Sequence, residues 1–486
     1  MSTLVRSATL IALGVVAQLA TAATQSISFP ALTDQTLGSA PVAITAKASS
    51  GLPVSFESTT PSVCKVAGDL VVALSPGPCF IAAHQAGSGV YSAASVSQGF
   101  HVTAPRPSGT LRLGATAGNS HTLLLAQADF NHDGFADIAS ADQEGNLTIF
   151  LGDGSGAFHE AGKPTAFDAS VQALVAGDFD GDGNTDLAIA TSADQVTILL
   201  GNGAGAFTAS PGSPFAAGTG PRSLAIGDFN RDGIEDLAIA NFSGSVTVLA
   251  GDGAGDFAPL SGSPFAAGAG TSAAIAADFN GDGLVDLAAA NSSDGNVSVL
   301  LATPAGGFTP AQGSPFAVGM LPQSMVVADF NRDGIADLAT ANRGAGSLTV
   351  LLGTGSGGFI AAPGNPIAVG LSLQSVAVGD LDGDGVVDLI ASSNADGIKV
   401  FRGDGAGGFR APAVFGSPLN SVFAVIGDFN GDGISDVATA NFVAGGVTIL
   451  TGGLSDTIAL LHGPTGSVSP GGSVALTLDM SQATVA

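Results

Sequence analysis

The chain has 486 residues, of which 45% are hydrophobic and only 11% are charged, so it can fold a sizeable core and lacks the composition of a disordered acidic chain. The 40 acidic and 13 basic residues give a formal net charge of −27, which argues against nucleic acid or anionic membrane surfaces as partners. Cations are the natural counterpart of such a chain.

The N-terminal residues predict an export signal. Arg6 is followed by an apolar stretch over residues 8–19 and by the small residues ATA at 20–22. This order is typical of a secretory signal peptide, which we place at residues 1–22. The apolar stretch is shorter than the ~20 residues that a membrane-spanning helix needs, and no other segment approaches that length. We therefore expect a secreted or cell-surface protein without membrane insertion.

Residues 24–105 predict a small all-β sandwich, because short alternating runs such as PVAITAKA and LPVSFES are separated by Gly, Pro and Ser. Both cysteines of the chain, Cys64 and Cys79, lie here. In an exported chain such a pair is more often a disulfide than a metal or redox site, and two buried thiols are the alternative. The string SVCKVAGDLVVALSPGPCFIAAHQAGSGVYSAASVSQGFHV resembles immunoglobulin-like modules of bacterial surface proteins, which implies an Ig-like β-sandwich.

A motif of closely spaced aspartates before an apolar strand then recurs seven times. Its copies run from DFNHDGFADIA at position 129 to DFNGDGISDVA at position 428 and begin 49, 50, 50, 51, 51 and 48 residues apart. In the third unit we expect strands at residues 223–229, 236–241 and 245–250, and a weaker outer strand from position 257. Four-stranded units repeated seven times predict an all-β fold with a seven-bladed β-propeller at residues 109–455.

The last unit predicts how the ring closes. A glycine-rich turn and a phenylalanine mark the fourth strand, as in GDGAGDF at position 251, but the seventh unit lacks this segment. Residues 109–118 precede a first unit that already has four strands, so we expect them to pair beside residues 447–450; the run 457–461 is the competing candidate. The tail at 456–486 contains GSVSPGGSVALTLDM, the possible start of another Ig-like module.

The repeated motif has the chemistry of a cation site. Oxygen-bearing side chains at positions one, three, five and nine form a cage of hard donors that suits calcium, and glycine at position six allows a sharp turn. These positions hold 23 of the 40 acidic side chains. An EF-hand would need Glu at position twelve and flanking helices, whereas position twelve here is Ser, Ile, Ala or Thr. Aspartates that only cap turns are the structural alternative, although a turn needs one such side chain.

The seven units resemble FG-GAP or VCBS repeats, the calcium-bearing blades of integrin α-subunit propellers and of many bacterial secreted proteins. The resemblance covers residues 114–454 and implies about seven Ca²⁺ ions, each also bound by the backbone carbonyl at position seven. The side-chain ligands that it implies are Asp129, Asn131, Asp133, Asp137, Asp178, Asp180, Asp182, Asp186, Asp228, Asn230, Asp232, Asp236, Asp278, Asn280, Asp282, Asp286, Asp329, Asn331, Asp333, Asp337, Asp380, Asp382, Asp384, Asp388, Asp428, Asn430, Asp432 and Asp436. Because all seven loops keep the pattern, we expect calcium to be part of the framework of every blade.

The repeats supply little for catalysis. They contain three histidines, His121, His132 and His159, and no cysteine, so neither a nucleophile–base pair nor a histidine-rich metal site is expected. We predict that the protein is not an enzyme, and only a carboxylate-based mechanism stays open.

The side chains that stand out from the repeat pattern are Phe242, Phe442 and Arg343, which we place in loops between second and third strands, on the face opposite the calcium loops. By family analogy a partner docks on this face, while ordinary exposed residues are the alternative. We expect a monomeric interaction or adhesion module with a protein or glycan ligand. A secreted lectin or polysaccharide lyase on the same scaffold is the second hypothesis, although the chain has no Trp and a single Tyr91 outside the repeats.

Overall fold

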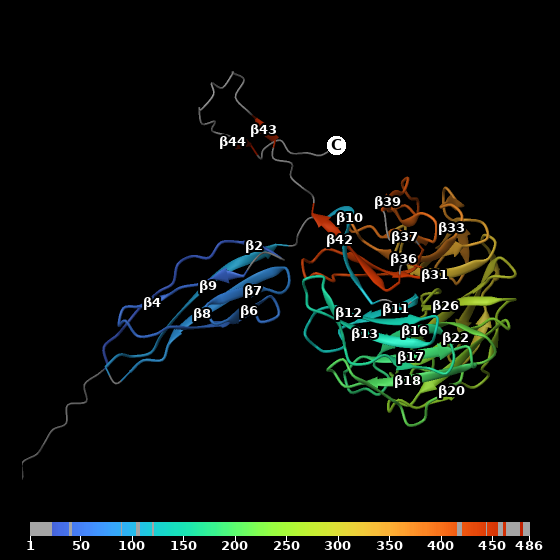
Figure 1. Ribbon diagram of the computed structural model, residues 1–486, viewed down its shortest axis with the longest axis horizontal. Coiled ribbons are helices and arrows are strands. Elements are labelled where there is room, and N and C mark those ends of the chain that lie inside the picture. The colour runs from blue at the N-terminus through green and yellow to red at the C-terminus, as the bar shows by residue number, and fades with distance from the viewer. Residues whose placement is uncertain are drawn as a thin grey trace, which may run out of the picture. The chain divides into compact units, whose positions relative to one another are not determined.

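The computed structural model describes residues 22–37, 41–88, 90–103, 107–118, 121–415, 420–443, 445–454, 460–462 and 477–479. All regular structure in these segments is β-strand, so the all-β prediction is confirmed. No helix within them has the length and apolarity to cross a membrane. The chain divides into two units, Met1–Pro105 and Arg106–Ala486, which Figure 1 shows in blue and in cyan to red. The predicted signal peptide lies outside the described residues, apart from residue 22.

The N-terminal unit consists of three small sheets around one apolar core. Their orders are β2-β9-β8-β5, β3-β7-β6 and β1-β4. The strands are β1 (Ile27–Ser28), β2 (Gln35–Thr36), β3 (Val42–Ala43), β4 (Lys47–Ala48), β5 (Ser55–Ser58), β6 (Cys64–Ala67), β7 (Leu70–Ala73), β8 (Gly77–Gln85) and β9 (Ala94–Thr103).

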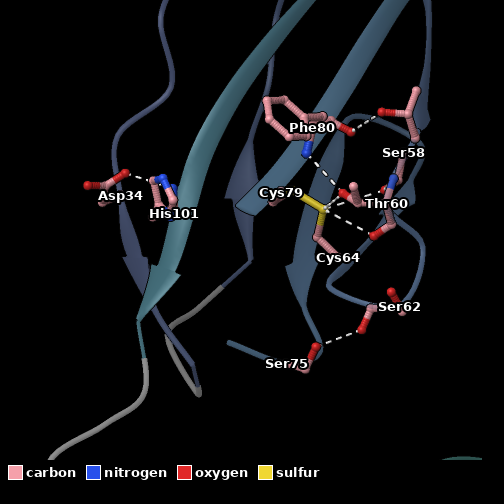
Figure 2. Close-up of a disulfide and its surroundings, with 10 residues drawn as sticks. Asp34, Ser58, Thr60, Ser62, Cys64, Ser75, Cys79, Phe80 and His101 are labelled. Atoms are coloured by element: carbon pink, nitrogen blue, oxygen red, sulfur yellow. Dashed lines mark hydrogen bonds between the residues drawn. A yellow bond between two sulfur atoms is a disulfide. The ribbon is translucent and has the colours of Figure 1, made fainter. Parts of the chain in front are cut away.

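A disulfide joins the first residue of β6 to β8 inside this core (Figure 2). Cys64 and Cys79 are fully buried, and their Cα atoms lie 5.8 Å apart. Beside them, the Thr60 hydroxyl accepts a hydrogen bond of 3.0 Å from the Phe80 amide. The crosslink closes a loop of 15 residues, which restricts the unfolded chain of a unit with a small core.

The described part of the second unit contains a ring of seven antiparallel sheets, the blades (Figure 1), and a separate two-stranded sheet near the C-terminus. Within the first six blades the four main strands follow one another in chain order from the first strand outward, whereas the outermost strand of the seventh blade comes from the N-terminal side of the ring. The second strands, such as DLAIAN in β22 (Asp236–Asn241), are buried along their whole length. Their continuous apolar sequences reflect sheets that are covered on both faces, here by the neighbouring blades, since each apolar cluster joins residues of consecutive blades.

The first five blades have four main strands and a short fifth. These strands are β11 (Thr122–Ala128), β12 (Asp137–Asp142), β13 (Asn146–Gly152), β14 (Phe158–Glu160) and β15 (Thr165–Ala166); β16 (Val171–Gly177), β17 (Asp186–Thr191), β18 (Gln195–Gly201), β19 (Phe207–Ala209) and β20 (Phe215–Ala216); β21 (Pro221–Gly227), β22, β23 (Ser245–Gly251), β24 (Phe257–Pro259) and β25 (Phe265–Ala266); β26 (Thr271–Ala277), β27 (Asp286–Asn291), β28 (Asn296–Ala302), β29 (Phe308–Pro310) and β30 (Phe316–Ala317); and β31 (Pro322–Ala328), β32 (Asp337–Asn342), β33 (Ser347–Gly353), β34 (Phe359–Ala361) and β35 (Ile367–Ala368).

The last two blades have four strands each. They are β36 (Leu373–Gly379), β37 (Asp388–Ser393), β38 (Gly397–Phe401) and β39 (Ala413–Phe415), followed by β40 (Ser421–Gly427), β41 (Asp436–Asn441), β42 (Val447–Leu454) and β10 (Pro107–Ala117).

The expected strand bounds need two corrections. The first strand of the third blade ends at Gly227, two residues before the predicted end, because Asp228 and Phe229 already belong to the loop that follows. The outer strand is broken into two short pieces, since β24 pairs with residues 249–251 of β23 and β25 with residues 245–246. Between the pieces the Ser263 hydroxyl accepts a hydrogen bond of 2.8 Å from the Val248 amide, so a side chain replaces the missing strand.

The predicted ring closure is confirmed. β10 pairs antiparallel with β42, with Leu113 opposite Leu450 and Leu111 opposite Gly452, and Figure 1 shows the two strands side by side. The N-terminal strand thus completes the seventh blade. The competing run 457–461 lies partly outside the described residues, and its described part belongs to β43 (Leu460–His462), which pairs with β44 (Thr477–Asp479).

Candidate metal centre

Each blade joins its first and second strands by a nine-residue acidic loop, whose positions are numbered one to nine. These loops span residues 129–137, 178–186, 228–236, 278–286, 329–337, 380–388 and 428–436. The aspartate at position nine is also the first residue of the second strand in every blade. The start of a fully buried strand thus fixes one carboxylate of each loop.

The position-nine carboxylate ties the loop to the sheet. In the first blade, one oxygen of Asp137 accepts the Phe130 amide at 2.8 Å and the other accepts the Gly152 amide at 2.8 Å. The same pair of hydrogen bonds recurs in all seven blades. All seven of these aspartates are at most 1% exposed, so each is a buried carboxylate without a basic partner among its hydrogen bonds.

Position one organises the turn of the loop. Asp129 accepts the amide of Gly134, at position six, at 2.9 Å, and every other loop repeats this contact. Gly134 has a φ of 88°, a left-handed conformation that favours glycine. The expected role of glycine at position six is therefore seen in the backbone.

Positions three and five bring further oxygens to the same place. The second and sixth loops have Asp at position three. In each of these two loops, three aspartates contribute one carboxylate oxygen each, and the three oxygens lie within 4.8 Å of one another. The aspartates are Asp178, Asp180 and Asp186, and Asp380, Asp382 and Asp384. The other five loops have Asn at position three, and its amide nitrogen donates to the position-five carboxylate, for example from Asn131 to Asp133 at 2.9 Å.

The electrostatics of the loops favour a bound cation. Burial, opposed in part by the two amide hydrogen bonds and assisted by neighbouring carboxylates, raises the pKa of Asp186 from its ordinary 3.8 to about 6. Five other position-nine aspartates behave alike, and the pKa of Asp436 rises to about 7 for the same reasons. A dication would offset both the burial and the mutual repulsion, and side-chain donors that are carboxylate and amide oxygens suit calcium.

Three contacts link loops to their surroundings in ways that the repeat pattern did not predict. The Glu235 carboxylate of the third blade accepts the amide of Asp178 in the second at 3.0 Å. His132 and Asn184 connect the first two loops through Nε2 and Oδ1 at 2.8 Å. Arg402 lies 3.5 Å from Asp382, at position three of the sixth loop. Glu235 stands where the other units have Ala, Thr, Val or Ser, Asn184 where they have Phe, Ile, Leu or Val, and Arg402 where they have Leu, Ala or Thr. These departures from the repeat pattern were the available signal.

The opposite face is built from the loops between second and third strands and the connections that enter each first strand; we call it the interaction face. Backbone hydrogen bonds connect these loops to these connections; for example, the Phe242 amide donates to the Gly220 carbonyl at 2.7 Å. Phe242 and Arg343 both line a cavity between the first strands. Phe442 instead packs against His121, with ring centroids 5.5 Å apart. Two of the three predicted side chains thus share one site.

Comparison with known proteins identifies the repeats. A profile described as "FG-GAP-like repeat" matches residues 129–189, 178–239, 228–289, 278–340, 330–391 and 380–439. No curated protein matches the chain significantly.

Two solved structures show the same fold. The BP39L lectin from Burkholderia pseudomallei is 17% identical, with a TM-score of 0.53 over 70% of this chain and 97% of the lectin. BBS1N, solved in complex with ARL6DN, is 12% identical, with a TM-score of 0.52 over 72% of this chain and 98% of BBS1N. At these identities the likeness concerns the fold alone.

Proposed function

Because the chain belongs to the FG-GAP-like repeat family, we propose that it is an exported, calcium-stabilised β-propeller that acts as a non-enzymatic interaction module. The observation that carries the calcium role is the set of seven buried carboxylates at position nine, each beside further oxygens and each without a basic partner among its hydrogen bonds. The ligands would be the side chains at positions one, three, five and nine. Calcium would supply the positive charge that the hydrogen-bond partners of the position-nine carboxylates lack.

A stability measurement tests this role. If the dissociation constant of each site is a tenth of the ambient calcium concentration, binding raises the free energy of unfolding by roughly 1.4 kcal/mol per site and by about 10 kcal/mol for seven sites. The propeller has roughly 350 residues and an unfolding entropy of about 0.7 kcal/mol per kelvin. Chelation should therefore lower its melting temperature by about 10–15 °C, and added Ca²⁺ should restore it. An equal melting temperature with and without the chelator would refute the framework role.

Export is supported by the residues at 1–22, which have the order of a signal peptide, and by the disulfide of the N-terminal unit. We also assign that unit to the immunoglobulin-like class and take the protein to be a monomer. Recovery of the mature chain from the medium or cell surface, with residues 1–22 removed, tests the export. Retention of an uncleaved chain in the cytoplasm would contradict it.

The second candidate is a carbohydrate-binding propeller, because a lectin shares the fold. We favour a protein ligand, since the interaction face exposes large apolar side chains, including Met320, Leu371 and Val443, that are 67%, 79% and 63% exposed. Large exposed apolar patches on soluble proteins are typical of surfaces that bind other proteins. A glycan array and a polysaccharide activity screen distinguish the two, because specific glycan binding or cleavage would favour the lectin or lyase.

A further inference from the structure

The first strands of the seven blades enclose a central cavity of about 1100 Å³. Its deeper wall is mainly apolar and includes Leu174, Leu224, Ile275 and Met325, although Gln127 near the end of β11 and serines of other first strands also line it. At its mouth, the second residue of the first strand is polar in the second to sixth blades; these residues are Gln172, Arg222, Ser272, Gln323 and Gln374. The mouth lies at the interaction face, because loop residues of that face also line the cavity.

Arg222 and Arg343 are the charged side chains of the described cavity lining, which contains no acidic residue. This is unusual in a chain with 40 acidic and 13 basic residues. Neither guanidinium lies within ion-pair distance of a carboxylate of the described residues. An arginine without an anion at the mouth of a cavity is a suitable partner for a carboxylate, because its planar guanidinium can bind a carboxylate through two parallel hydrogen bonds.

The two arginines are held in place by neighbours. Arg222 donates from Nη1 to the Gln172 side-chain oxygen at 2.7 Å, and its guanidinium carbon lies 5.4 Å from the centre of the Phe242 ring. Arg343 donates from Nη1 to the Gln323 side-chain oxygen at 3.4 Å. These contacts use neutral partners and leave N–H donors of each fork for a ligand. Arg222 is thus positioned before any ligand arrives, which lowers the entropy cost of binding.

The rim around the mouth is apolar. Phe242 and Leu321 line the cavity and are 48% and 47% exposed. Met320 precedes Leu321 in the same connection, and Leu371 and Val443 lie on the same face. Arginine and large apolar side chains, with few acidic groups, are the composition of the centre of a protein–protein interface.

From these observations we propose that the mouth of the central cavity binds an acidic side chain of a partner protein, an Asp or Glu flanked by large apolar residues. Its carboxylate pairs with Arg222, which Gln172 and Phe242 hold in place, and Arg343 adds positive charge at the same mouth. Its apolar neighbours pack on Phe242, Leu321 and the cavity wall. The assignment rests on the proposed interaction function and names the site and the chemistry of its ligand.

Selection from a displayed library of short random peptides on the intact calcium-loaded protein tests the assignment. We expect enriched peptides with an acidic residue beside Leu, Ile, Met or Phe. Replacing that residue by its amide, or the protein by the Arg222→Gln/Arg343→Gln variant, should weaken binding of the synthesised peptides about tenfold or more. The matched control is Lys163→Gln/Arg410→Gln, which removes two exposed positive charges outside the cavity and should leave the affinity unchanged.

The possible results distinguish a failure of the proposed cavity site from a failure of the proposed interaction function. Peptides without acidic enrichment, or with equal affinity for the wild type and the Arg222→Gln/Arg343→Gln variant, would overturn the cavity site while leaving an interaction module intact. Failure of the library to yield any binding peptide would also overturn it. Both arginines are exposed, so an unchanged melting temperature of the double variant will show that a loss of binding is not a loss of folding.

Discussion

The closing strand offers a sharp test of how the ring is held together. Leu111 of β10 is 9% exposed and packs with Leu381, Ile398, Val437 and Leu450, residues of the sixth and seventh blades. Truncation by Leu111→Ala removes buried methyl groups and leaves a cavity, which costs about 3 kcal/mol. Divided by an unfolding entropy of about 0.7 kcal/mol per kelvin for roughly 350 residues, this lowers the melting temperature by about 4 °C.

The same strand supplies the control. Leu113 lies two residues further along β10 and is 64% exposed, so Leu113→Ala makes the same change in strand propensity with a cost under about 0.5 kcal/mol. Calorimetry in saturating calcium should show the whole propeller transition shifted by Leu111→Ala, because each blade depends on both neighbours. Equal effects of the two variants, or a separate early transition of one blade with the rest unmoved, would refute the reasoning.

Two further predictions concern the acidic loops. Arg231, at position four of the third loop, has a φ of 67° where the fourth blade has Gly281 at 75°, so Arg231→Gly should stabilise the propeller by about 0.5–1 kcal/mol. The denaturation midpoint checks this, and Gly281→Arg should shift it in the opposite direction; a destabilising Arg231→Gly would show that the loop holds no such strain. The raised pKa values of the position-nine aspartates, about 6 against an ordinary 3.8, mean that the calcium-free fold binds protons more tightly than the unfolded chain. Its stability should therefore rise as the pH falls from about 7.5 through 6 towards 4, whereas the calcium-loaded protein should lose stability as protons displace the ion. Melting temperatures of protein desalted into calcium-free and calcium-containing buffers test the sign, and parallel pH slopes in both would contradict it.

The sequence predicts the parts of the fold whose signals are local. The polar positions of an acidic loop lie within nine residues, and the strand that follows is marked by an unbroken apolar run, so loop and second strand are visible without knowledge of the ring. The closure was also predicted, because a missing fourth strand after residue 450 and an extra strand before the first unit favour their pairing over the competing run 457–461. Both inferences depend on counting within a repeat.

Features that depend on contacts between distant residues escaped the prediction. The Ser263 side chain replaces a strand by accepting a hydrogen bond from an amide 15 residues earlier. This contact recurs in the second to fifth blades, but the repeated Ser-Pro or Asn-Pro pair does not reveal its partner in the sequence. Glu235 reaches the loop of another blade, and its partner is set by ring geometry. Arg222 and Phe242 meet because β21 pairs with β22, and the cavity that they line exists only once seven first strands surround an axis. For the same reason the sequence shows that Phe242 and Arg343 depart from the repeat pattern, but it does not show that they line the same cavity.

The closing strand also determines how the protein responds to mechanical load. Pro107 at the start of β10 is paired with Leu454 at the end of β42, so the two chain segments that leave the propeller depart from the same end of one strand pair. Tension between the N-terminal unit and the C-terminal tail therefore acts on one hydrogen-bonded pair at a time, in the manner of a zipper, rather than shearing the whole pair at once. Single-molecule pulling from the two termini should open this pair first and at low force, and a high-force rupture of the intact ring would contradict it. If the protein is held at both ends while a partner is bound at the interaction face, the β10–β42 pair is the part of the propeller that we expect to open first.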